Sequence, residues 1–287
     1  MSAVRAEVPQ EKPGFVLAGG VRLRIARWDS EGGDYPALLV HGLSSGWQTW
    51  LPPLPYLYPA LAPVALDLRG HGDSDKPESE YSLAHYAADV WTAMTKLRFK
   101  RPPVLIGHSL GGAVVRRVAA DHAEFLAAVV IEDSYLWTHR DRTAEQAEQM
   151  GRDRLASARL PFPDLVQAEL DRDPSLSYRQ ATEKARRVAN VADGVLLNMW
   201  EGVALPDGER WEDVLPRITC PALLVRGNPN LGGLVPEEDA ARQAALFPRL
   251  AVASFPEAGH SIHGDQPEAF AAAVLGFLRE NGVLSEG

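Results

Sequence analysis

The feature that most constrains the fold of this chain is the regular exchange of short apolar runs with segments of helical periodicity. Residues 37–40 and 104–106 are uninterrupted apolar runs, and each is followed by a glycine-containing loop. Between them, residues 81–97 carry apolar side chains at helical spacing, with Ser82 as the expected N-cap. Such alternation is typical of a parallel sheet whose strands are buried on both faces. We therefore predict an α/β fold with a mostly parallel central sheet flanked by helices.

The same criteria predict the remaining elements of this fold. Strands are expected at 15–17, 21–27, 63–67, 127–131, 222–226 and 250–255, and further helices at 113–122, 237–246 and 267–280.

The alternation stops at about residue 136 and resumes after residue 216. The intervening chain is charged, poor in strand signals and helical in pattern. We interpret 136–216 as a helical cap inserted into a core domain formed by 1–135 and 217–287. Acids outnumber the arginines of the cap, so we interpret its charges as a solvated face rather than an anion site.

One serine lies in a distinctive glycine-rich turn. The sequence Gly107-His108-Ser109-Leu110-Gly111 joins a predicted strand to a predicted helix. In a Gly-x-Ser-x-Gly turn of this kind the serine occupies a strained conformation, and the glycines let strand and helix approach each other. Ser109 is therefore the predicted nucleophile. The backbone N–H of Leu110, at the helix N-terminus, is a predicted oxyanion donor, and no metal or cofactor is expected.

Four segments, taken in order, resemble the α/β-hydrolase superfamily from about residue 15 to 278. They are Val-His-Gly-Leu-Ser at 40–44, Asp-Leu-Arg-Gly-His-Gly-Asp-Ser at 67–74, the serine turn, and Gly-His-Ser-Ile-His at 259–263 followed by Pro-Glu-Ala-Phe. The resemblance implies the α/β-hydrolase fold and an esterase-like or lipase-like serine enzyme. It also implies a second oxyanion donor, the backbone N–H of Leu43, with that of Ser44 as the alternative.

A serine nucleophile needs a base, and histidine titrates in the required range. Among eight histidines, His260 follows the last predicted strand, where the superfamily places its base, and His263 is its rival. We interpret His41, His71 and His108 as residues that shape the loops around the site.

The acid is harder to locate in this sequence. The loop at 227–236, where the superfamily usually has it, contains no carboxylate, and Asn230 stands near the expected position. Some members instead take the acid from the preceding strand, which here ends in Glu132 and Asp133. The resemblance points to Asp133, 24 residues after Ser109. Glu132 remains the alternative acid, since side chains alternate along a strand and only one of the two faces the histidine.

Four tryptophans are candidates for contact with the substrate: Trp47, Trp50, Trp137 and Trp200. Trp47 and Trp50 follow the expected oxyanion loop, whereas the other two belong to the cap. Aromatic side chains commonly line apolar ligand pockets.

Composition narrows the range of partners and locations. The chain has 38 acids against 29 lysines and arginines, a net charge of −9, which argues against nucleic acid. No apolar run approaches the roughly 20 residues of a membrane helix, and the polar first residues lack a signal-peptide pattern. Cys220 is a single cysteine, so neither an intrachain disulfide nor a cysteine zinc site is expected. We expect a cytoplasmic protein whose partner is a small-molecule acyl substrate. The sequence leaves a homodimer open.

The sequence thus predicts a serine hydrolase that cleaves a small or medium uncharged ester or lactone through an acyl-enzyme on Ser109. Cleavage of a carbon–carbon bond, hydrolysis of an amide and cofactor-free perhydrolysis use the same triad and remain alternatives. A non-catalytic ligand-binding receptor on the same fold is the alternative from another class.

Overall fold

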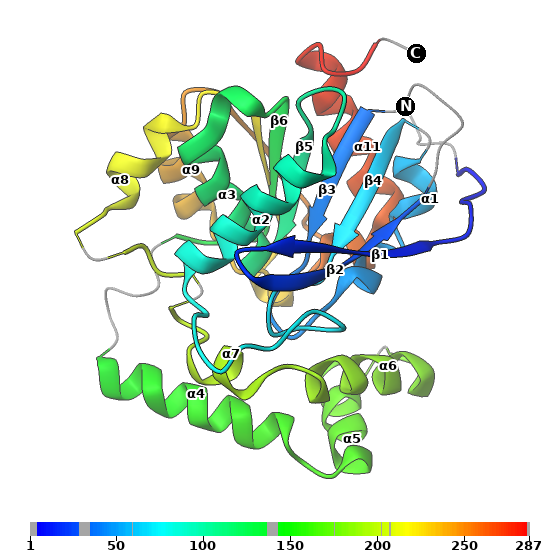
Figure 1. Ribbon diagram of the computed structural model, residues 1–287, viewed down its shortest axis with the longest axis vertical. Coiled ribbons are helices and arrows are strands. Elements are labelled where there is room, and N and C mark those ends of the chain that lie inside the picture. The colour runs from blue at the N-terminus through cyan, green and yellow to red at the C-terminus, as the bar shows by residue number, and fades with distance from the viewer. Residues whose placement is uncertain are drawn as a thin grey trace.

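The computed structural model describes residues 5–28, 35–58, 60–136, 143–174, 176–201, 203–206 and 208–285. Within these ranges, eight strands form one sheet in the order β1-β2-β4-β3-β5-β6-β7-β8 (Figure 1). The two pairings of β2, with β1 and with β4, are antiparallel, and all other neighbours are parallel. The predicted α/β fold with a mostly parallel sheet is confirmed.

The strands have these bounds: β1 Lys12–Ala18, β2 Val21–Arg27, β3 Tyr35–Val40, β4 Leu61–Leu66, β5 Val104–His108, β6 Ala128–Glu132, β7 Ala222–Arg226 and β8 Leu250–Ser254. The helices outside the β6–β7 connection are α1 Leu54–Leu57, α2 Leu83–Leu97, α3 Leu110–His122, α9 Glu237–Leu246, α10 Ile262–Asp265 and α11 Pro267–Glu280. Short 3-10 turns are η1 Trp47–Trp50, η2 Ala123–Phe125, η3 Leu215–Arg217 and η4 Pro229–Leu231.

The central strands are buried on both faces because successive side chains point to opposite sides of the sheet. In β3, Leu38 and Val40 pack into the core beneath α2 and α3, whereas Ala37 and Leu39 pack into the core beneath α1 and α11. All four side chains are fully buried. Continuous apolar runs, rather than alternating ones, are what such a two-sided sheet requires.

The chain between β6 and β7 forms a helical insertion, with α4 Ala144–Ala158, α5 Phe162–Arg172, α6 Tyr178–Ala189, α7 Asp193–Leu197 and α8 Trp211–Val214. Both α4 and α6 begin with a capping box, which satisfies N–H groups that a helix start leaves without partners. Figure 1 shows α4 to α7 together, beyond one end of the sheet. The Ala192 N–H donates to the Gly70 carbonyl at 2.8 Å, which fastens the insertion to the loop after β4.

Within the described ranges, no helix has both the length and the apolar character needed to cross a membrane.

Candidate active site

Ser109 lies in the tight turn between β5 and α3, with φ of 54° and ψ of −114°. A positive φ is strained for a residue with a side chain, and such strain is concentrated at functional sites. A Cβ at Gly107 would lie 2.2 Å from the Gly111 carbonyl oxygen, and one at Gly111 would lie 2.1 Å from that of Val40. The two glycines of the sequence pattern are therefore required by backbone-to-backbone approach around the serine.

His260 is paired with Asp133 across the carboxyl ends of the sheet. The Nδ1–H of His260 donates to Oδ2 of Asp133 at 2.7 Å. Asp133 is fully buried, whereas the His260 side chain is 33% exposed. The residue before Ser109 joins this arrangement, because Nε2 of His108 donates to the His260 carbonyl oxygen at 2.9 Å. Hydrogen bonds thus connect the turn that holds Ser109, His260 and the carboxylate of Asp133.

The loop after β7, which lacks an acid of its own, holds the acid supplied by β6. Oδ1 of Asp133 accepts from the Gly227 N–H at 3.2 Å, and Oδ2 accepts from the Leu234 N–H at 2.7 Å. Asn230, in contrast, is exposed in the turn η4. These two donors could not be predicted from the sequence, because a backbone N–H group is present whatever the side chain.

Glu132 makes a second carboxylate–histidine pair, with His263. Both oxygens of Glu132 lie within 2.9 Å of Nδ1 of His263, and Oε1 also accepts from the His263 backbone N–H at 2.9 Å. The remaining nitrogen, Nε2, is bonded to the Thr49 hydroxyl at 2.7 Å. Both members of the pair are fully buried. The two adjacent acids at the end of β6 therefore bind different histidines, and Glu132 binds the rival rather than His260.

Two buried histidines shape the loops after β3 and β4. In both His41 and His71, Nδ1 donates to a backbone carbonyl. Nε2 of His41 accepts from the Leu68 N–H at 3.0 Å, and Nε2 of His71 accepts from the Ser44 N–H at 3.4 Å. Burial lowers the pKa of His41 to about 4 and that of His71 to about 3. Both rings are therefore neutral near pH 7, as an accepting nitrogen requires.

The loop after β3 lies directly against the serine. A Cβ at Gly42 would be 3.1 Å from the Ser109 Cβ and 2.8 Å from Nδ1 of His108. Leu43, whose backbone N–H is a predicted oxyanion donor, follows in this loop and is half-buried. Leu110, the other predicted donor, is the first residue of α3, where a helix leaves N–H groups without intrahelical partners.

Trp50 differs from its predicted place in a pocket wall. Its side chain is fully buried, with its ring 4.7 Å from that of His263 and 6.3 Å from that of Phe270. Trp50 therefore packs the core beneath α11, because η1 turns its indole under the sheet instead of toward the loops.

The other tryptophan candidates have different surroundings. Trp47 is half-buried and packs against Trp28, with 5.9 Å between ring centroids. Trp200 is half-buried in the segment after α7. Trp137 lies outside the described residues.

Among the described residues, one group of three metal-capable side chains lies together: His108, Glu132 and His263, with ligand atoms within 4.8 Å of one another. Glu132 and both nitrogens of His263 are already engaged in the hydrogen bonds given above. The structure therefore accounts for this group as a hydrogen-bonded pair beside His108.

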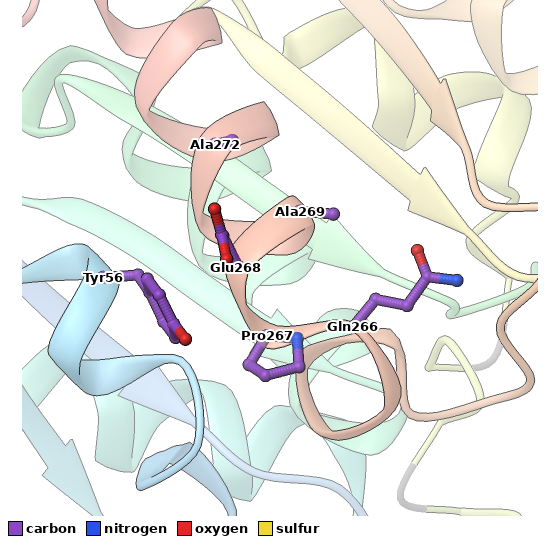
Figure 2. A pocket seen from close by; sticks show the side chains of 6 residues that line it. All are labelled: Tyr56, Gln266, Pro267, Glu268, Ala269 and Ala272. Atoms are coloured by element: carbon purple, nitrogen blue, oxygen red, sulfur yellow. The ribbon is translucent and has the colours of Figure 1, made fainter. Parts of the chain in front are cut away.

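Two cavities differ in which residues of the site line them. One, of about 790 Å³, lies between the helical insertion and the segments η1 and α10, and its walls include Thr49, Arg187, Ser261 and His263. The other, of about 510 Å³, lies between α1 and the start of α11; Figure 2 shows Tyr56 facing Glu268 across it. The lining of this second cavity includes neither carboxylate–histidine pair. The first cavity borders His263 and Ser261, the neighbour of His260, but its lining does not include Ser109, His260 or Asp133.

Comparison with known proteins identifies the family. Residues 37–273 match the family model described as the alpha/beta hydrolase family. The protein belongs to the alpha/beta hydrolase family, and it is a hydrolase of that family.

Known relatives cover most of the chain. The chain is 30% identical over 269 residues to the dihydrolipoyllysine-residue acetyltransferase component of the acetoin cleaving system of Pseudomonas putida, a match that covers 90% of this chain and 68% of the relative. It is 29% identical over 259 residues to 2-(acetamidomethylene)succinate hydrolase of Mesorhizobium japonicum, covering 86% of this chain and 90% of the relative. A crystal structure of E-2-(acetamidomethylene)succinate hydrolase shares the fold, with a TM-score of 0.77 at 23% identity over 94% of this chain and 99% of the other.

Proposed function

We propose that this protein is a serine hydrolase that cleaves a small or medium ester or lactone. The observation that carries the proposal is the 2.7 Å hydrogen bond from His260 Nδ1 to the buried Asp133, beside a serine held at positive φ. This bond fixes the orientation of the imidazole and directs Nε2 to the proton-transfer role. In this proposal Ser109 is the nucleophile, His260 the base and Asp133 the acid.

The reaction proceeds in two halves. Ser109 Oγ forms a bond to the carbonyl carbon while His260 Nε2 takes its proton, and the backbone N–H groups of Leu43 and Leu110 bind the oxyanion. When the carbonyl re-forms, the alkoxide leaves with the proton from His260, and the acyl group stays on Ser109. Water then loses a proton to His260, attacks the acyl-enzyme and releases the carboxylic acid and the free serine.

We further propose that 136–216 acts as a cap over the core formed by 1–135 and 217–287. The hydrogen bond from the insertion to Gly70 supports this role, because it fastens the helices over the loops that surround Ser109. Trp47 and Trp200, both half-buried, remain candidates for contact with the substrate. The cytoplasm is the location that we propose, on the basis of the single, buried Cys220.

The proposal is tested by intact-mass analysis after exposure to a fluorophosphonate. We expect one adduct on the native protein and none on Ser109→Ala, followed by turnover of members of an ester and lactone panel. Labelling of both proteins, or turnover by Ser109→Ala, would rule out Ser109 as the nucleophile.

Amide hydrolysis is a second candidate, and one comparison favours it. The relative from Mesorhizobium japonicum is named for an acetamido compound, and it matches this chain over 86% of its length. The same serine, histidine and acid would serve, with the nitrogen leaving group taking the proton from His260. Adding N-acetyl enamides to the substrate panel separates the two candidates, because faster cleavage of these amides than of the matched esters would favour amide hydrolysis.

A further inference from the structure

Three arginines of the helical insertion gather around one buried carboxylate. Arg154 of α4, Arg172 of α5 and Arg187 of α6 each lie within electrostatic reach of one carboxylate, the buried Glu169. Arg172 forms an ion pair with Glu169. Glu169 thus lies among three cations, and Arg187 is also within reach of the exposed Glu183.

Arg187 and Arg154 have no ionic partner in the described part of the chain. The acids near Arg187 are committed elsewhere, in the pairs Arg179–Glu183 at 3.1 Å, Lys184–Asp173 at 3.8 Å and Arg172–Glu169. For Arg154, the Nε atom is buried without a hydrogen-bond partner among these residues. Two guanidinium groups are therefore left to interact with something other than the protein.

Desolvation makes this arrangement costly. Burial lowers the pKa of Arg154 and of Arg187 from the ordinary value. The charge of Glu169 opposes that effect at Arg154, and the charges of Glu183 and Glu169 oppose it at Arg187. A buried cation without a counter-ion destabilises a fold, whereas an anionic ligand that pairs with it removes the penalty on binding. Arg154 and Arg187 are half-buried, so an anionic ligand that pairs with them would offset part of this cost.

Arg187 is also placed over the active-site loops. A Cβ at Gly46, in the loop after β3, would lie 3.8 Å from Cδ of Arg187. After burial, the positive charge of Arg187 is the next cause that lowers the pKa of His41, in the same loop. Arg187 also lines the cavity of about 790 Å³ whose opposite wall includes Ser261, the neighbour of His260. Arg187 thus lines the space between the insertion and the segments η1 and α10.

We propose that Arg187, assisted by Arg154, binds a carboxylate group of the substrate, so that the ester or lactone cleaved at Ser109 is an anionic compound. This inference rests on the proposed function and replaces the uncharged substrate expected from the sequence. Arginine suits the task because its planar fork matches two carboxylate oxygens. Arg187 and Arg154 are specificity-determining residues in this proposal, distant from the bond that breaks.

The test compares two p-nitrophenyl esters of equal length, the neutral valerate and the glutarate monoester, which ends in a carboxylate. We expect the native protein to prefer the glutarate ester. Arg187→Met should lower kcat/KM for that ester about 10- to 100-fold, the loss typical of one charge-assisted pair, with less than about 3-fold effect on the valerate. Arg187→Lys should retain part of the preference, and Arg154→Met should reduce it less than Arg187→Met.

The matched control is Arg152→Met. Arg152 lies on the same helix as Arg154 but is half-exposed and paired with Glu148. This variant should leave both esters unchanged. Equal rates of the native protein on the two esters, or an equal loss on both in Arg187→Met, would overturn the carboxylate subsite while leaving the serine hydrolase proposal intact.

A binding measurement separates failure of the subsite from failure of the hydrolase proposal. Glutarate, at matched ionic strength, should raise the Tm of Ser109→Ala but not that of Ser109→Ala combined with Arg187→Met. If neither ester is turned over and this difference is still found, the hydrolase proposal fails and the anion subsite stands. If Tm responds alike in both variants, the subsite is overturned.

Discussion

Two carboxylate–histidine pairs, Asp133–His260 and Glu132–His263, lie at the end of β6, yet their exposure differs sharply. The His260 side chain is 33% exposed, while that of His263 is 1% exposed. Asp133 occupies one nitrogen of His260, and no other group in the described ranges is bonded to its Nε2. In His263 both nitrogens are bonded within the protein. A carboxylate partner is therefore common to His260, the proposed catalytic histidine, and to His263. What distinguishes the two rings is a second nitrogen that a ligand can reach.

The largest expected difference between the two pairs is in activity, when each acid is replaced by its amide. Asp133→Asn should lower kcat/KM about 10⁴-fold, because the amide holds the imidazole in the wrong tautomer and cannot stabilise its positive charge. Glu132→Gln should lower kcat/KM less than about 10-fold, since Glu132 affects the reaction only through the position of the segment that carries His260 and His263. The ester or amide identified in the substrate panel provides the assay. The reverse order would make Glu132 the acid.

Stability should respond in the opposite order. Glu132→Ala removes one partner of a fully buried pair and leaves the His263 backbone N–H without an acceptor. The expected cost is about 3–5 kcal/mol in the free energy of unfolding, measured by urea denaturation. Glu257→Ala, at an exposed position in the loop between β8 and α10, should change the free energy of unfolding by less than about 0.5 kcal/mol. A small effect of Glu132→Ala would show that the pair does not stabilise the fold.

Two buried histidines without a carboxylate partner among the described residues, His41 and His71, should make the stability of the fold depend on pH. His41 and His71 ionise near 6.5 when unfolded, but burial lowers the pKa in the fold to about 4 and about 3. The unfolded chain thus binds more protons below pH 6.5, and stability falls as the pH decreases toward 4, by roughly 3 kcal/mol for His41 alone.

Asp67 opposes this trend, because burial raises its pKa from 3.8 to about 6, so that its folded form binds more protons in that window. We expect net acid destabilisation by urea denaturation between about pH 7 and 4.5, and a shallower slope for His71→Gln. Stability that stays constant or rises over this range would contradict the neutral state of the loop histidines.

The smallest expected effect concerns the hydroxyl that completes the buried pair. Thr49→Val keeps the shape of the side chain and removes its bond to Nε2 of His263. We expect a loss of about 1 kcal/mol in unfolding free energy and a change of less than about 3-fold in kcat/KM. Thr49→Ser, which keeps the hydroxyl, should retain most of the stability. A large fall in kcat with Thr49→Val would mean that His263 takes part in proton transfer.

The layout of the sheet and the turn at Ser109 could be predicted because they depend on local rules. Apolar runs report burial on both faces of β3 and β5, and the glycines around Ser109 report a backbone approach that admits no side chain. Both requirements can therefore be inferred from residue types alone.

The assignment between Glu132 and Asp133 was open for a physical reason. β6 ends at Glu132, and Asp133 has φ of 42°, so the strand rule that places neighbours on opposite faces does not apply at the point where it is needed. The burial of Trp50 could not be predicted either, nor that Arg187 forms no ion pair with another described residue, because both depend on which distant segments pack around them.

The hydrogen bond between Asp133 and His260 joins two parts of the chain that the helical insertion separates. The proposed nucleophile and acid lie before the insertion and the proposed base lies after it. The two parts meet through the pairing of β6 with β7, from Val129 opposite Ala222 to Glu132 opposite Val225. The pairing of β6 with β7 is thus the contact that brings these residues together. A chain divided within the insertion would place Ser109 and Asp133 on one fragment and His260 on the other, so that recovered turnover would report the docking of two strands.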